Sequence, residues 1–138
     1  MALPSGWLGQ ADNFLGIDEP WCHPDQAGVY VLPAPYEHTS SYILGSDRGP
    51  SAIIEASQQV ELYDETLRYE PYREWGGVAT AATLNLDGRV DGPAVQAIQD
   101  FVQPHVGRGK FLVTLTGNWY MKTSVPLCSL APRWPEWD

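Results

Sequence analysis

The 138-residue sequence has only two cysteines and no long uninterrupted apolar run. Cys22 and Cys128 lie far apart and neither belongs to a C-x-x-C motif, which argues against a disulfide scaffold or a cysteine-rich zinc site. No apolar stretch approaches the roughly 18 to 20 residues that cross a bilayer, and the N-terminus lacks the basic and apolar segments of a secretory signal. We therefore expect a soluble, cytoplasmic protein with reduced thiols.

Positive charge is also scarce, because the sequence has 8 Lys and Arg but 17 Asp and Glu, which gives a net charge of −9. This balance repels phosphate backbones and anionic lipid, so we expect no nucleic-acid partner and no membrane partner. The sequence does contain 43% apolar and 12% aromatic residues. That composition, at this length, is typical of one globular domain with one core.

The first half of the chain predicts an irregular arm, a strand and a helix. Residues 1–27 are rich in Gly, Pro, Asp and Trp without a steady period. Residues 28–32 (GVYVL) predict a buried strand that stops at Pro33-Ala34-Pro35. Gly49-Pro50 is typical of a helix start. The apolar spacing that follows predicts a helix over 50–60 with one buried face, made of Ala52, Ile53, Ala56, Val60 and Tyr63.

The second half predicts a further helix and strand. Residues 61–79 indicate a loop with a short strand near Val78, and residues 85–88 (NLDG) indicate a turn. A helix should begin beside Pro93 and end near Gly107, with an apolar face of Val95, Ile98, Phe101 and Val102. Residues 110–115 (KFLVTL) predict a strand buried on both sides of a parallel sheet.

These elements, with connections too long for hairpins, favour an α/β fold with a parallel sheet. Functional groups in such sheets collect at the carboxyl ends of the strands, which here are residues 33–38 and 116–119. We expect three segments: an irregular N-terminal arm over 1–27, an α/β domain over 28–117, and an irregular, non-homologous tail over 118–138.

The tail differs from the protein before it, because the last 22 residues hold three of the six Trp and three of the twelve Pro without any period. One hypothesis is that a GC-rich reading frame has slipped after about residue 116. The alternative is a genuine irregular arm that packs its tryptophans on a partner.

Three stretches carry a resemblance to a known family. Residues 31–42 (VLPAPYEHTSSY), Gly45 with residues 48–57 (RGPSAIIEAS), and residues 59–64 (QVELYD) closely resemble the start of agmatinase/arginase-type ureohydrolases. The similarity spans about residues 14–117. It implies a three-layer α/β/α fold around a parallel sheet, incomplete in this chain. It also implies a centre of two manganese ions that hydrolyses a guanidino group to urea and an amine.

The resemblance also implies where metal ligands should lie. The family supplies them from a Gly-Gly-x-His turn, an Asp-x-His-x-Asp segment and an Asp-x-Asp segment. This sequence reads Thr116-Gly117-Asn118-Trp119 at the first turn, so Trp119 stands at the ligand-histidine position, and an indole has no lone pair to give a metal. The other two motifs fall beyond the end of the sequence. We therefore expect this chain to bind no metal ion and to be catalytically incompetent alone.

The loop after the first strand keeps the only candidate site residues. In the family this loop shapes the mouth of the active site, so we expect substrate contact from Glu37, His38, Thr39 and Ser40. A hydrogen bond that merely anchors the loop is the alternative for His38. His23 and His105 are expected to be surface histidines.

Three hypotheses of function follow. The first is an N-terminal ureohydrolase fragment, inactive alone, whose intact form acts on a small guanidino molecule. The second is a non-catalytic interaction module that associates with full-length ureohydrolase subunits or with copies of itself. The third, a hydrolase built on Cys22 and His23, is weak because sequence neighbours rarely converge as nucleophile and base.

Overall fold

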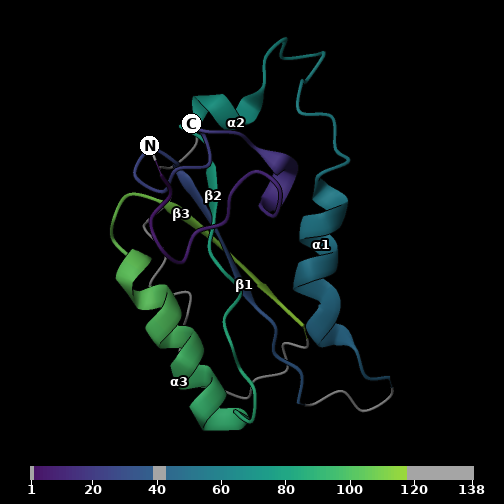
Figure 1. The fold of residues 1–138 in the computed structure, drawn as a ribbon, viewed down its shortest axis with the longest axis vertical. Coiled ribbons are helices and arrows are strands. Elements are labelled where there is room, and N and C mark those ends of the chain that lie inside the picture. The colour runs from purple at the N-terminus through teal and green to yellow at the C-terminus, as the bar shows by residue number, and fades with distance from the viewer. Residues whose placement is uncertain (1, 39–42, 118–138) are drawn as a thin grey trace, which may run out of the picture.

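The computed structural model describes residues 2–38 and 43–117, whose strands form one parallel sheet in the order β2-β1-β3. Strand β1 (Val29–Ala34) lies at the centre, between β2 (Val78–Thr80) and β3 (Phe111–Thr116) (Figure 1). The predicted parallel α/β sheet and the short strand near Val78 are confirmed.

Strand β1 is longer than predicted, because it continues through Pro33 to Ala34. The carbonyl oxygen of Pro33 accepts a hydrogen bond from the Leu84 N–H at 2.9 Å, on the side of β1 that faces β2. The ring nitrogen of Pro33, which carries no hydrogen, faces the same side at a level beyond the end of β2. The missing N–H of Pro33 therefore costs no hydrogen bond between β1 and β3.

Helices cover both faces of this sheet and give the expected partial three-layer α/β/α arrangement (Figure 1). Helix α3 (Asp91–Val102) packs Ala94, Ala97 and Ile98 against Tyr30 and Leu32 of β1. The opposite face of the sheet is covered by the N-terminal arm and α1. The other helices of the described residues are α1 (Gly49–Ser57), α2 (Pro71–Glu74) and the 3-10 turns η1 (Phe14–Gly16), η2 (Ser46–Arg48) and η3 (Gln103–His105).

Helix α1 is shorter than predicted and buries a different face. Its buried residues are Pro50, Ile54 and Ser57, whereas Ile53 and Val60 on the predicted face are 46% and 56% exposed. Contact with the arm fixes this orientation, because the hydroxyl of Ser57 accepts a hydrogen bond from the Leu15 N–H at 2.8 Å. Beyond Ser57 the chain continues as a tight turn, in which the N–H groups of residues 58–60 bond to carbonyls three residues earlier.

Two other sequence expectations need correction. Strand β3 is not buried on both sides, because it lies at the sheet edge of the described chain, with Phe111 42% exposed and the remaining five residues half-buried. The loop expected over 61–79 contains the short helix α2. In α3, the predicted burial of Ile98 and Val102 is confirmed, while Val95 and Phe101 are only half-buried.

The N-terminal arm lies along the outer edge of β2. The Leu8 N–H donates to the Thr80 carbonyl at 2.9 Å, and the Ala82 N–H donates to the Gly6 carbonyl at 2.8 Å. Between these bonds Trp7 forms an antiparallel bridge with Ala81. The arm therefore satisfies backbone groups that the edge of β2 would otherwise leave open. None of the helices in the described ranges is both long and apolar enough to cross a membrane.

Candidate functional site

The carboxyl ends of β1 and β3 meet, as the topology predicts. Ala34 lies in register with Thr116, so the loop after β1 begins beside the residue that follows β3. That residue is Gly117, and a Cβ added there would lie 2.6 Å from the carbonyl oxygens of both Tyr36 and Ser46. Such a contact leaves no room for any side chain. We call this junction of the two strand ends and the start of η2 the strand-end site.

Glu37 closes the loop that leaves the strand-end site. Its carboxylate accepts hydrogen bonds from the Gly45 N–H at 2.8 Å and 2.9 Å, one to each oxygen. Ser46 donates to the same carboxylate through its N–H at 3.1 Å and its hydroxyl at 2.9 Å. These bonds join the two ends of the loop, so the carboxylate of Glu37 acts here as a clamp. Contact of Glu37 with a substrate stays a prediction.

His38 lies next to the start of α3. Its Nε2 atom is 3.8 Å from Oδ2 of Asp91, and the two side chains are 44% and 73% exposed. The backbone N–H of Asp91 donates to the hydroxyl of Tyr36 at 3.1 Å, which holds α3 against the same loop. This distance is longer than a hydrogen bond, so both substrate contact and the loop-anchoring hydrogen bond of His38 stay predictions. The other two candidates, Thr39 and Ser40, and the expected ligand position Trp119 lie outside the described residues.

No set of metal ligands is assembled in the part of the chain that the structure describes. In residues 2–38 and 43–117 no group of three or more His, Cys, Asp or Glu side chains could hold a metal ion. Within these residues, His38 and Asp91 form a pair that no third such side chain joins. The described residues therefore do not fit a two-metal centre. The absence of metal binding by the whole chain stays a prediction.

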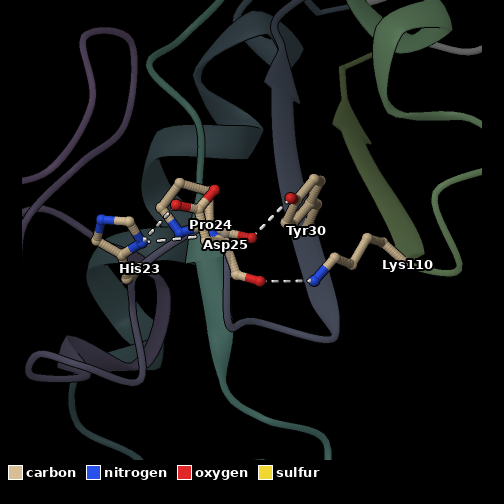
Figure 2. Close-up of polar contacts among 5 residues, drawn as sticks. All are labelled: His23, Pro24, Asp25, Tyr30 and Lys110. Atoms are coloured by element: carbon tan, nitrogen blue, oxygen red, sulfur yellow. Dashed lines mark hydrogen bonds and ion pairs between the residues drawn. The ribbon is translucent and has the colours of Figure 1, made fainter.

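His23 is buried rather than a surface histidine, with only 4% of its surface exposed. Its Nδ1 atom accepts the Asp25 N–H at 3.3 Å and lies 3.7 Å from Oδ2 of Asp25. Figure 2 shows how this turn is tied to the strands: the Tyr30 hydroxyl donates to the Pro24 carbonyl at 2.7 Å, and Nζ of Lys110 donates to the Asp25 carbonyl at 3.2 Å. These bonds hold the arm to β1 and to the start of β3.

His105 is half-buried, which also corrects the sequence expectation. Its ring makes edge-to-face contacts with the rings of Trp7, Tyr30 and Phe101 at centroid distances of 5.6, 5.3 and 6.5 Å. The Nδ1 atom is buried and has no hydrogen-bond partner within the described part of the chain. Burial lowers the pKa of His105, and the positive charge of Arg108 lowers it further.

The thiol of Cys22 is fully buried. Burial raises the pKa of this thiol, and the negative charge of Glu19 acts in the same direction. A thiol held in its protonated form and shielded from solvent is a poor nucleophile. The structure therefore gives the hydrolase hypothesis on Cys22 and His23 no support.

The sheet and the strand-end site together define the first layers of an α/β/α protein whose functional edge lies at the carboxyl ends of parallel strands. The chain belongs to the arginase family, which it matches over residues 27–125. This match includes the loop after β1, all of β3 and the first residues after the predicted boundary at 117.

The curated proteins to which the chain is similar share one name. The chain is 41% identical over 129 residues to the N(1)-aminopropylagmatine ureohydrolase of Synechocystis sp., a match that covers 91% of this chain. It is 32% identical over 94 residues to the protein of the same name from Thermus thermophilus, covering 68% of this chain. No solved structure gives a significant match.

The chain spans only 42% of the Synechocystis relative and 31% of the Thermus relative. These shares agree with the expectation, drawn from the resemblance, that the chain corresponds to part of a ureohydrolase.

Proposed function

We propose that this chain is the N-terminal part of a manganese-dependent ureohydrolase acting on a guanidino compound of the aminopropylagmatine class, and that it is inactive alone. The observation that carries this proposal is the junction of Ala34, Thr116 and Gly117 at the carboxyl edge of the sheet. This junction is where a family-wide turn with a ligand histidine would begin. The names of the relatives support the substrate class.

The proposed role of the described residues is architectural. The net charge of −9 would attract a cationic guanidino substrate toward this part of the enzyme. Glu37 holds the loop beside the strand-end site, and Tyr36 fixes the start of α3 against it. In the intact family two metal ions supply a hydroxide at neutral pH. The described residues do not fit that centre, so no catalytic step is assigned to them.

Urea release tests the proposed inactivity. Purified chain is incubated with aminopropylagmatine or agmatine and excess Mn²⁺, and urea is measured beside the intact Synechocystis relative at equal concentration. The expected result is rapid urea release by the relative and none above background by the chain. Manganese-dependent urea release by the chain, lost on chelation, would overturn the proposal.

The origin of residues 118–138 belongs to the same proposal. We expect that the DNA read past the Thr116 codon contains, in a shifted frame, a Gly-Gly-x-His turn followed by Asp-x-His-x-Asp and Asp-x-Asp segments. Sequencing the encoding DNA and translating all forward frames checks this. If no frame contains these segments, the tail is a genuine arm and the frameshift hypothesis is wrong.

Among the described residues, strand β3 has a neighbouring strand on one side only, and this edge favours one second candidate, a non-catalytic module that associates with full-length ureohydrolase subunits. Mixing the purified chain with the intact relative distinguishes the two candidates. Cosedimentation of the chain with the intact relative supports the module, whereas a free chain in that mixture counts against it.

A further inference from the structure

Two backbone hydrogen bonds tie the first residues of the N-terminal arm to the outer edge of β2. One runs from the Leu8 N–H to the Thr80 carbonyl at 2.9 Å, and the other from the Ala82 N–H to the Gly6 carbonyl at 2.8 Å. We call residues 2–10 the strap. The strap covers backbone groups of an edge strand that would otherwise face solvent.

The chain directly after the strap has its own attachments to the core. The Phe14 N–H donates to the Thr80 hydroxyl at 2.9 Å, and the Leu15 N–H donates to the Ser57 hydroxyl at 2.8 Å. Asn13, which precedes them, is fully buried. The strap can therefore leave the sheet while this anchored segment stays in place.

The ring of His105 packs directly on the strap. Its centroid lies 5.6 Å from that of Trp7, in an edge-to-face contact. Trp7 in turn lies 4.7 Å from the ring of Tyr30, and His105 also contacts Tyr30 and Phe101. Of these four rings, that of His105 titrates nearest to neutral pH.

The buried Nδ1 atom makes this contact depend on the protonation of His105. Within the described residues this atom has no hydrogen-bond partner. The neutral imidazole carries an N–H on one nitrogen only, whereas the charged ring carries an N–H on both. Charging the ring in place would therefore bury an N–H donor at Nδ1 without an acceptor, which costs free energy. The charged ring is more stable where water reaches Nδ1.

The positive charges near the ring act in the same direction. Burial lowers the pKa of His105, and the charge of Arg108 on the loop before β3 lowers it further. Lys110 adds another positive charge beside this cluster, because its Nζ atom lies 5.8 Å from the centroid of the Tyr30 ring (Figure 2). The Tyr30 hydroxyl supplies no negative charge near neutral pH, because burial raises its pKa.

The carboxylates of the neighbouring segments do not offset this charge. Asp25 lies 3.7 Å from Nδ1 of His23, and Asp100 on α3 accepts a hydrogen bond from Gln96 at 2.9 Å. The strap has no charged side chain. Among residues 2–38 and 43–117, no carboxylate forms an ion pair with His105.

We propose that the strap is a pH-sensitive cover of the sheet edge, which lies on β2 while His105 is neutral and leaves β2 when His105 takes up a proton. Departure of Trp7 opens the ring cluster, so that water solvates the charged imidazole. The proton binds the open state more tightly than the closed state, and this difference shifts the equilibrium towards the open state. The Thr80 carbonyl and the Ala82 N–H are then available to pair with another strand.

Amide hydrogen exchange of the full chain, followed by NMR, tests the proposal. Protection factors, which correct for the intrinsic pH dependence of exchange, are measured at pH 8 and pH 5. At both pH values the N–H groups of Leu8 and Ala82 should be protected at least about tenfold less than those of Phe14 and Leu15, because the strap opens separately. Their protection should fall about tenfold on acidification, which corresponds to a tenfold difference in proton affinity between the two states. Equal protection at all four positions, or no fall at Leu8 and Ala82, overturns the proposal.

Three variants assign the pH dependence to His105. His105→Phe keeps a ring against the strap but cannot be protonated, so the protection of Leu8 and Ala82 should no longer fall on acidification. Arg108→Gln removes a positive charge from an exposed position and should reduce the fall. His38→Gln is the matched control, because this histidine is exposed and lies outside the ring cluster, and it should leave the fall unchanged.

The variants also give the results that contradict the proposal. A fall of wild-type size in His105→Phe overturns it, as does loss of the fall in His38→Gln. If His105→Phe does not fold, Arg108→Gln decides, and a fall equal to that of the wild type then overturns the proposal.

Discussion

Glu37 and Ser46 lie on opposite sides of a loop and are joined by two hydrogen bonds, from the N–H and the hydroxyl of Ser46 to Oε1 of Glu37. With the N–H of Gly45 added, one carboxylate binds both ends of the loop next to the strand-end site. Glu37 is therefore the residue on which the position of the loop relative to β1 depends most directly.

Removing this carboxylate is expected to loosen the loop and destabilise the fold. Glu37→Ala leaves the N–H groups of Gly45 and Ser46 without their acceptor, at a cost of about 1–3 kcal/mol for charge-assisted bonds of this kind. Equilibrium unfolding in urea measures the change. Glu55→Ala, which removes an exposed carboxylate from α1, is the control and should change stability by less than about 0.5 kcal/mol. If both substitutions lower the free energy of unfolding equally, the hydrogen bonds of Glu37 contribute nothing to stability.

His105 makes stability depend on pH. Its folded-state pKa lies below the usual value of about 6.5, because burial and Arg108 disfavour the charged ring. As pH falls through 6.5 the unfolded chain therefore takes up the proton first, so the contribution of His105 is complete above that pH and is lost on acidification. Thermal melts between pH 8 and pH 5 should show this decline.

Two substitutions check that His105 is the cause. His105→Phe keeps an aromatic ring against Trp7 and Tyr30 but cannot take up a proton, so its melting temperature should fall less on acidification. Arg108→Gln removes the nearby positive charge and should reduce the decline in part. If the melting temperature of both variants falls with pH as steeply as that of the wild type, His105 is not the cause of the decline.

Gly117 is predicted to tolerate no side chain. A Cβ at this position would lie 2.6 Å from two backbone carbonyl oxygens, which belong to different segments and cannot rotate away. Gly117→Ala should therefore cost about 1–3 kcal/mol, the usual range for overpacking. Gly92→Ala is the matched control, because its Cβ would meet nothing within 4 Å and its position in α3 favours alanine. Unfolding free energies of the two variants settle the comparison.

Local sequence signals predicted the strands and the region of the strand-end site well. The β-branched run before Pro33 and the apolar run after Lys110 both form strands, and their parallel pairing places residue 34 beside residue 116. The buried face of α1 was predicted wrongly, because several of the apolar residues on the predicted face are exposed, and the face that is buried is the one held by the bond between Leu15 and Ser57.

Contacts between distant segments account for what the sequence could not predict. Nothing near Asp91 in the sequence indicates that its carboxylate lies by His38, because that proximity arises only when α3 packs on the sheet. The burial of His23 and His105 likewise depends on the path of the N-terminal arm, whose sequence has no period. Of the residues discussed in this paragraph, only Gly117 has a local sequence signal for its close contacts, because a glycine beside a strand often marks a close approach of another backbone segment.

We propose that residues up to Gly117 form a competent first part of a ureohydrolase. The most direct measurement replaces the matched N-terminal segment of the Synechocystis relative with residues 1–117 of this chain and follows urea release from aminopropylagmatine with Mn²⁺. We expect manganese-dependent urea release by the fusion and none by this chain alone. A fusion that unfolds cooperatively, as the intact relative does, but releases no urea would contradict it.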